Sequence, residues 1–254
     1  APGKLRIGSA TISDTHEYDI LTVAEVIQKS SNVGTAKIAL SMQPHDMWAM
    51  FDAAGFGAPL KLGFPGEVGG RLRPVKTWRP IEQATMSYGH GISVTLMQMA
   101  HAYLAFARDG DLPPLSLMKR EVPPVAGRHL FSSKTAREVR SMLEMVMQPG
   151  GTAFKAHIPG YRTAGKTGTA RKVENGAYTK KYVASFVGFA PVSQPRLVIA
   201  VMVDEPSNGK YYGGEVAAPV FSQVMEGSLR TLGVASDAPL APLPQDVEKV
   251  PEEM

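Results

Sequence analysis

Three extended segments follow one another in the second half of the chain, with only short links between them. Residues 161–173 have an extended character, and the Asn-Gly pair at 175–176 is a strong signal for a tight turn. Residues 182–190 are rich in β-forming side chains, and residues 197–203 form the unbroken apolar run of a buried strand. Because strands with such short links pair antiparallel, this region predicts a small antiparallel sheet.

Segments with helical periodicity precede this sheet, and one follows it. Thr22 with Glu25 three residues later is a capping-box signal for the first helix. In the last helix we expect Val220, Val224 and Leu229 to face inward. Helices first, then a small sheet and a covering helix, predict an α+β fold. The predicted helices lie around residues 22–30, 38–40, 47–51, 94–108, 135–147 and 215–232, with loops at 55–80 and 111–128.

The composition is that of a globular protein and excludes several kinds of site. The chain has 254 residues, enough for a large core, and 44% of them are hydrophobic. It has no cysteine, which excludes disulfides and a cysteine nucleophile and fits an oxidising compartment. Six histidines lack ligand spacing, so we expect no metal and no cofactor. A net charge of +4 does not predict nucleic-acid binding, and no apolar run approaches the roughly 20 residues that span a bilayer.

Charge is unevenly distributed along the chain. Residues 235–254 are rich in proline, alanine and acid, so we expect one domain over residues 1–233 and a mobile tail over 234–254. Basic side chains gather instead between residues 166 and 181. Such a patch suits a small anionic group better than a long polyanion, and a solvated face is the alternative. The basic residues are Lys166, Arg171, Lys172, Lys180 and Lys181.

Residues 160–167 read Gly-Tyr-Arg-Thr-Ala-Gly-Lys-Thr and fit the pattern of a phosphate-binding P-loop letter for letter. A P-loop needs a buried strand before its first glycine and a helix that begins at its lysine. Residues 156–159 are poor strand material, and the residues from Gly168 onward favour a strand over a helix. We therefore expect a strand over residues 161–173, and nucleotide hydrolysis is a remote alternative.

The same lysine begins a second motif. Lys-Thr-Gly at 166–168 fits the K-[ST]-G of serine penicillin-recognising enzymes, which also carry S-x-x-K and S-x-N. Ser-Ser-Asn at 30–32 fits S-x-N between two predicted helices. Each motif alone is weak, because a helix end with its cap explains residues 30–32 and an exposed strand lysine explains residue 166. Their order and the sheet that follows favour the functional interpretation.

Longer stretches make the resemblance to a family specific. The chain resembles class B penicillin-binding proteins, and more closely the division-specific peptidoglycan D,D-transpeptidases of Gram-negative bacteria, to about residue 233. That resemblance implies a helical subdomain packed against a subdomain with a five-stranded antiparallel sheet. The stretches are Gln-Lys-Ser-Ser-Asn-Val-Gly at 28–34, Gly-Phe-Pro-Gly-Glu at 63–67, residues 81–91, Ala-Gly-Lys-Thr-Gly-Thr-Ala-Arg-Lys at 164–172 and Tyr-Tyr-Gly-Gly at 211–214.

The chain departs from this family at the nucleophile. The family's nucleophile is the serine of S-x-x-K, on a helix N-terminal to S-x-N, and no S-x-x-K precedes Ser30. The two later matches, at 116–119 and 207–210, follow prolines and are not expected to be helical. We expect that an N-terminal remainder carries the S-x-x-K together with two strands of the family's sheet and the membrane anchor. The chain alone is then inactive.

The resemblance implies the cross-linking of peptidoglycan stem peptides at the septum through a serine acyl-enzyme, with β-lactams as inhibitors. The implied partners are the N-terminal remainder, stem peptides, β-lactams and membrane proteins of the division machinery. The implied location is the periplasmic face of the bacterial inner membrane. A penicillin-sensing domain of the same fold, which acylates without cross-linking, is the alternative.

Three residues carry catalytic roles by this resemblance. Ser30 relays a proton towards the leaving nitrogen, and Asn32 hydrogen-bonds the donor amide and the missing lysine. Lys166 supplies positive charge beside Ser30 and the substrate carboxylate.

Further residues carry binding roles. Hydroxyls of Thr167 and Thr169 bind the substrate carboxylate, and the Thr169 N–H is one oxyanion donor. Gly168 leaves room for a substrate along the strand edge. Arg171 lies two residues beyond Thr169, on the same strand face, and assists carboxylate recognition; a solvated arginine is the alternative.

Aromatic side chains complete the expected site. Tyr211 and Tyr212 resemble the family's aromatic wall, or else pack under a Gly-Gly turn. At His90 the more usual residue is a second tyrosine, so His90 is expected to alter the loop near the cleft or to be structural.

Overall fold

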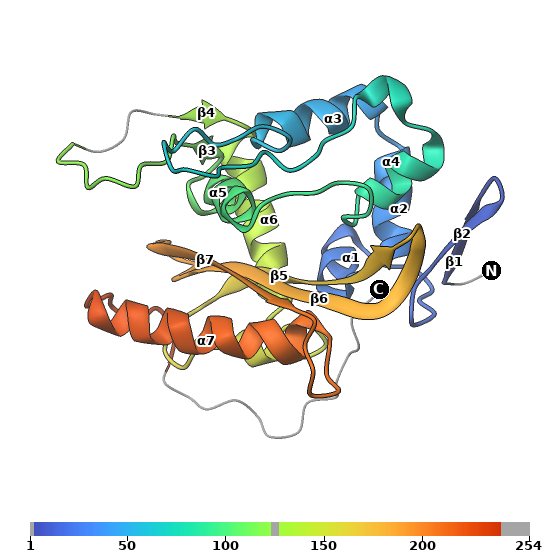
Figure 1. The fold of residues 1–254 in the computed structure, drawn as a ribbon. Helices are drawn as coiled ribbons and strands as arrows, with labels where there is room; N and C mark the ends of the chain where they lie inside the picture. The colour runs from blue at the N-terminus through green and yellow to red at the C-terminus, as the bar shows by residue number, and fades with distance from the viewer. Residues whose placement is uncertain (1–2, 123–126, 240–254) are drawn as a thin grey trace.

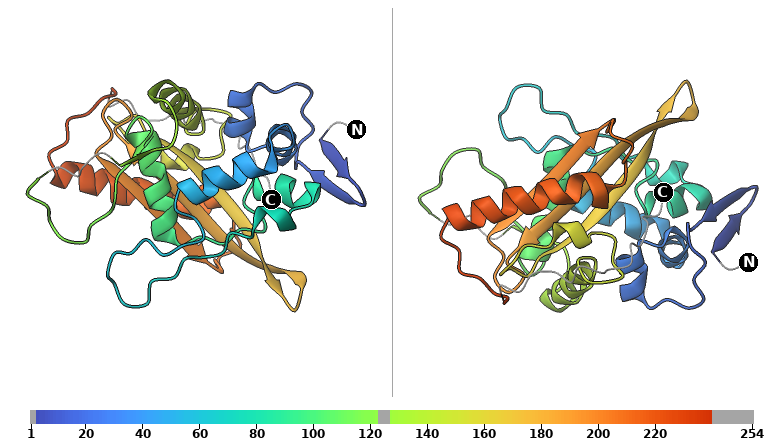
Figure 2. Two further views of the ribbon diagram at one scale, coloured as in Figure 1. Left: turned by 90° about the horizontal axis from the view of Figure 1, so that it is seen from above. Right: turned by 90° about the horizontal axis from the view of Figure 1, so that it is seen from below.

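In a computed structural model, described for residues 3–122 and 127–239, helices cover both faces of a central sheet (Figures 1 and 2). Helices α5 and α6 contact one face and α7 contacts the other, which confirms the α+β prediction. The helices are α1 (Val23–Lys29), α2 (Asn32–Leu40), α3 (Pro44–Ala53), α4 (Pro80–Met86), α5 (Leu96–Ala107), α6 (Ser133–Met145) and α7 (Gly213–Thr231). Single 3-10 turns lie at Val75–Thr77 and Phe154–Ala156.

The sheet is the antiparallel one that the sequence predicts. It contains β5 (Ala164–Glu174), β6 (Ala177–Ala190) and β7 (Leu197–Asp204) in that order. Asn175 and Gly176 both have positive φ, as a two-residue turn between right-twisted strands requires. Two small hairpins lie outside the sheet, one of β1 (Lys4–Ile7) with β2 (Ala10–Ser13) and one of β3 (Asp111–Leu112) with β4 (Arg128–His129).

Most helices begin where the sequence signals a cap. Thr22 and Glu25 form the predicted capping box of α1, in which each satisfies a backbone N–H of the other. Helix α4 was not predicted, because it lies at the end of a segment rich in Gly and Pro. Its signal is Pro80 at the first helical position, where the missing N–H costs nothing.

The core between the sheet and α7 corrects one prediction. Leu229 is buried as expected, but Val220 and Val224 are 42% and 48% exposed. The stripe of α7 that faces the sheet instead contains Phe221 and Met225, and Phe221 packs against Phe186 of β6. Residues 220 and 224 precede this stripe by one position, about 100° around the helix, and therefore point away from the sheet.

Residues 234–238, at the start of the expected tail, make contacts with the body of the domain. The Tyr161 hydroxyl donates to the Val234 carbonyl at 2.6 Å. The Asp237 carboxylate accepts from the backbone N–H groups of Arg162 at 2.7 Å and Ser193 at 3.1 Å. The acidic composition that suggests disorder here supplies a hydrogen-bond acceptor for the body of the domain. Residues 240–254 of the expected tail lie outside the described residues.

Candidate active site

The turn between α1 and α2 presents the Ser-Ser-Asn motif. Ser30 ends α1 with left-handed backbone angles, φ 61° and ψ 39°. Ser31 caps α2: its hydroxyl accepts from the Gly34 N–H at 2.9 Å and donates to Asp14. Asn32 is buried at the first position of α2. The capping role therefore belongs to Ser31, and the side chain of Ser30 takes part in another contact.

That contact is with Lys166 of β5. The Lys166 ammonium donates to the Ser30 hydroxyl at 2.7 Å, although the two residues are 136 positions apart. Ala164 of the same strand packs in a cluster with Leu143 of α6, and the period of two places Lys166 on this same helical side. The structure thus brings Ser30 and Lys166 together, with Asn32 two residues further along the same turn.

Thr167 is buried beside this pair. The Lys166 ammonium lies 3.4 Å from the Thr167 hydroxyl, and that hydroxyl is 2.9 Å from the hydroxyl of Thr152. Thr152 is itself buried, in the segment that links α6 to β5. Thr152 was not predicted from the sequence, because a threonine after two glycines carries no motif of its own.

The next residues of β5 are fixed against the N-terminus of α7. The Thr169 hydroxyl accepts from the Gly213 N–H at 3.0 Å, and the Gly168 carbonyl accepts from the Ser185 hydroxyl at 3.3 Å. A Cβ on Gly213 would lie 2.4 Å from the Ser185 carbonyl oxygen and 2.6 Å from that of Gly168. Only glycine therefore permits this close approach, and it fixes the position of the Lys-Thr-Gly-Thr segment.

One edge of β5 faces the helical half of the domain, which comprises the helices that precede the sheet in sequence. Among the described residues, β5 pairs with β6 alone, so its other edge has no strand partner. The backbone beside Lys166 and Gly168 can therefore accept an extended peptide as an added strand.

Arg171 lies on the β5–β6 hairpin, and the expected tyrosines lie beside it. Arg171 is exposed; its Nε donates to the Thr179 carbonyl at 3.3 Å and its guanidinium lies 5.9 Å from the Tyr178 ring. These contacts are within the β5–β6 hairpin rather than with Lys166. Tyr211 stacks between two rings, Tyr212 at 4.6 Å and Tyr182 at 4.1 Å. The expected pair of tyrosines is thus part of a stack of three, and Tyr182 was missed.

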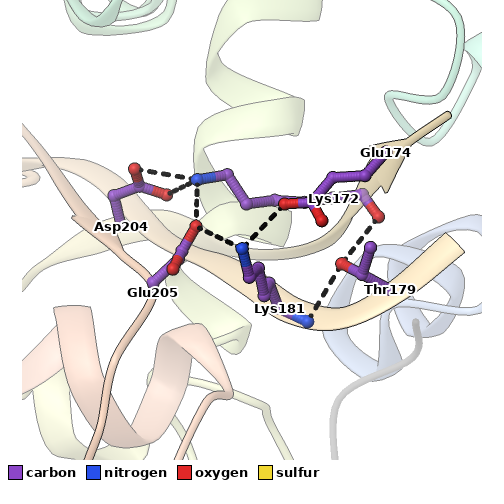
Figure 3. Close-up of polar contacts among 6 residues, drawn as sticks. All are labelled: Lys172, Glu174, Thr179, Lys181, Asp204 and Glu205. Atoms are coloured by element: carbon purple, nitrogen blue, oxygen red, sulfur yellow. Dashed lines mark hydrogen bonds and ion pairs between the residues drawn. The ribbon is translucent and has the colours of Figure 1, made fainter.

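The basic patch is smaller than the sequence suggests. Lys172 forms ion pairs with Asp204 and Glu205 at the end of β7, and Lys181 forms one with Glu174 at 2.8 Å (Figure 3). Hydrogen bonds to these carboxylates raise the pKa of both lysines. The charges of Lys172 and Lys181 are therefore balanced locally, and the positive charge beside Ser30 comes from Lys166.

The alternative motifs do not have the structure that their chemistry needs. Lys166 and Thr167 lie within a strand, and no helix begins there, which excludes a P-loop. The Ser-x-x-Lys matches at 116–119 and 207–210 are both non-helical. Within the part of the chain that the structure describes, no three His, Cys, Asp or Glu side chains gather as a metal site. No helix of that part is both long and apolar enough for a bilayer.

A Lys-Thr-Gly strand facing a Ser-x-Asn turn defines a penicillin-recognising serine enzyme domain. The chain belongs to the penicillin-binding protein transpeptidase domain family, whose profile matches residues 1–226.

Relatives and solved structures agree with this assignment. The probable peptidoglycan D,D-transpeptidase PenA of Neisseria gonorrhoeae is 47% identical over 236 residues, which are 92% of this chain and 40% of that protein. The peptidoglycan D,D-transpeptidase FtsI of Escherichia coli is 44% identical over 234 residues, again 92% of this chain and 40% of that protein. The transpeptidase domain of Burkholderia pseudomallei penicillin-binding protein 3 has 51% identity and a TM-score of 0.89, over 94% of this chain and 72% of that one. The chain thus spans less than half the length of the first two relatives.

Proposed function

We propose that this chain is the C-terminal part of a peptidoglycan D,D-transpeptidase that cross-links stem peptides at the division septum. The observation that carries the proposal is the 2.7 Å hydrogen bond from Lys166 to Ser30, beside a strand edge that no described strand pairs with. Two segments far apart in sequence supply one cation and one hydroxyl at a place where an extended peptide can bind.

The reaction that this arrangement serves is acyl transfer. The serine of an S-x-x-K motif, carried by a segment outside this chain, attacks the penultimate D-alanine carbonyl, and the C–N bond to the terminal D-alanine breaks. Ser30 passes a proton to the leaving nitrogen, and Asn32 orients the donor amide. An amine of a second stem peptide then attacks the acyl ester, which forms the cross-link and frees the serine.

The strand β5 binds the donor. Lys166 with the hydroxyls of Thr167 and Thr169 attracts the substrate carboxylate, and the Thr169 N–H is one donor of the oxyanion hole. Gly168 allows the peptide to lie close to the strand edge. Arg171 adds positive charge at the outer end, and Tyr211 with Tyr212 lines the side of the cleft.

The second sheet edge supports the proposal of an upstream segment. Among the described residues, β7 pairs with β6 alone, and Met202 is 54% exposed on it. An unpaired apolar edge favours pairing with another strand. We propose that strands of the N-terminal remainder, which also carries the S-x-x-K, cover this edge. The same remainder holds the anchor that places the domain at the periplasmic face of the inner membrane, beside division-machinery membrane proteins.

Labelling with a fluorescent penicillin tests the proposal. Residues 1–254 alone should not be labelled, whereas the chain joined to its preceding S-x-x-K segment should be. Lys166→Gln in the joined protein should slow labelling by about 100-fold or more, as loss of a positioned charge does. The proposal is wrong if intact mass finds an adduct on Ser30, Ser116 or Ser207 of residues 1–254.

A second measurement distinguishes a transpeptidase from a penicillin-sensing domain. Turnover of a thioester or stem-peptide analogue by the joined protein supports the transpeptidase. Stable acylation with no transfer to an amine would assign the chain to sensing.

A further inference from the structure

His90 contacts the β5–β6 hairpin from the helical half of the domain. The His90 Nδ1 atom lies 3.2 Å from the Tyr178 hydroxyl, and the two rings are 6.1 Å apart. His90 follows α4, and its own N–H donates to the Thr85 carbonyl at 3.0 Å. Figure 1 shows the hairpin extending past the sheet toward α4. The contact therefore joins two segments on either side of the candidate site.

The part of the hairpin that His90 reaches has little support from the sheet. Pairing of β6 with β7 ends at Val183, and one further backbone hydrogen bond joins Glu205 to Tyr182, so residues 177–181 have no partner in β7. A register shift between Arg171 and Val173 marks the point where the strand changes direction. A two-stranded hairpin is marginally stable in water, so its position depends on contacts made by side chains.

The side-chain contacts hold the hairpin at two places. At its base, Lys172 binds the carboxylates of Asp204 and Glu205 at the end of β7, and Lys181 binds Glu174 within the hairpin itself (Figure 3). Near its tip, Tyr178 receives the Arg171 guanidinium on its ring and the His90 nitrogen at its hydroxyl. The base is thus tied to the sheet, and the tip is tied to the helices.

The His90 contact continues inward to the turn that carries Asn32. Tyr88 lies edge-on to His90 at 5.3 Å. Tyr88 also packs against the cluster that contains Val33, the residue after Asn32. One continuous set of contacts thus joins the hairpin tip to the start of α2.

We propose that His90 and Tyr178 form a clasp that holds the tip of the hairpin against the segment after α4 and so positions the edge of β5. His90 is a positioning residue: it sets the spacing between the Ser30–Asn32 turn and the strand that carries Lys166. The consequence for acylation rests on the proposed function, whereas the clasp itself does not.

The test compares variants that keep or lose a polar atom at the Nδ1 position of the His90 ring. In His90→Asn a side-chain amide atom takes the place of Nδ1 and can bind the Tyr178 hydroxyl, whereas His90→Gln places its amide near Nε2. Tyr178→Phe removes the hydroxyl and keeps the ring. The matched control is Tyr161→Phe, which removes a hydroxyl that bonds Val234 away from the hairpin. All variants are made in the chain joined to its preceding segment and in residues 1–254.

Two quantities are measured in these variants: amide hydrogen exchange of residues 172–180 and the rate of penicillin acylation. Loss of one hydrogen bond should speed exchange about three- to tenfold. We expect this faster exchange in Tyr178→Phe and in His90→Gln, with no further change when the two substitutions are combined. His90→Asn and Tyr161→Phe should exchange as the parent does. Acylation should slow in Tyr178→Phe and His90→Gln but not in His90→Asn or Tyr161→Phe.

Unchanged exchange in Tyr178→Phe overturns the clasp. Faster exchange with unchanged acylation overturns the positioning role. If the parent itself is not acylated, the proposed function fails, and the exchange of residues 172–180 still decides whether the clasp exists.

Discussion

The β5–β6 pair contains two regions that are built differently. The inner part, residues 164–170 with 183–190, carries side chains buried on both faces: Phe186 faces α7 and Phe189 faces α5 and α6. The outer part, residues 171–182, is mostly exposed, and its contacts include ion pairs, one histidine, one cation over a ring and the stack of Tyr182 on Tyr211.

The inner part therefore fixes the position of the candidate site, and the outer part can adjust it. Apolar burial in the inner part places Lys166 and Thr167 with little dependence on solvent conditions. The outer part is held by interactions whose strength varies with pH and salt. Substitutions in the inner part should therefore unfold the domain, and substitutions in the outer part should change the position of the β5 edge.

The largest effect is expected from Phe186→Ala. Phe186 is fully buried against Phe221, and its loss should lower the free energy of unfolding by about 3–5 kcal/mol. Urea denaturation of the joined protein measures this. Val173→Ala in the outer part, at a side chain 57% exposed, should change it by less than about 0.5 kcal/mol. Equal losses would show that the two parts do not differ.

A smaller effect is expected from Gly213→Ala. The added methyl group meets the carbonyl oxygens of Ser185 and Gly168, so the α7 N-terminus must move and stability should fall by about 1–3 kcal/mol. Gly227→Ala in the same helix has open space around it and should raise stability by up to about 1 kcal/mol. A neutral Gly213→Ala would mean that β5 and α7 are not in close contact.

The outer part should respond to pH through His90. Burial lowers the pKa of His90 below its ordinary value of 6.5, so the folded hairpin favours the neutral ring. The stabilisation is present above that value and is lost as pH falls from it towards the folded pKa. Tyr88 and Tyr178 face the ring, with Arg171 beyond Tyr178. Protection factors of residues 172–180 should fall between pH 7 and 5, and His90→Asn should abolish that fall.

The smallest effect is expected from Lys172→Ala. Its ion pairs with Asp204 and Glu205 are partly exposed, so the melting temperature should fall slightly at low salt. The difference should disappear near 1 M salt, where charges are screened over about 3 Å. Lys180→Ala, at an exposed position of the neighbouring strand β6, is the control. A salt-independent loss would assign Lys172 a packing role.

Local signals predicted most of the fold. The Asn-Gly turn, the strand β7 and the Thr22–Glu25 box each depend on residues close in sequence, and each is confirmed. The apolar run suggested a buried strand, whereas β7 is only half-buried. The predicted inward face of α7 was wrong by one position at Val220 and Val224. These valines suggested burial, but the stripe that packs on the sheet consists of Ala, Phe, Met and Leu side chains.

The residues of the candidate site that belong to a motif were predictable from the sequence, and the others were not. The contact of Lys166 with Ser30 follows from two motifs with a shared role. Thr152, Tyr182 and the Tyr178 partner of His90 meet the site only through tertiary packing, at separations that no periodicity encodes.

The backbone of Ser30 has a consequence for laboratory evolution. A left-handed residue other than glycine is strained by roughly 1–2 kcal/mol, so Ser30→Gly should relax the end of α1 while removing the hydroxyl that Lys166 binds. A library screened for heat resistance alone would therefore enrich glycine at position 30. Selection for activity in the same library would restore serine, and the two screens would diverge at this one codon.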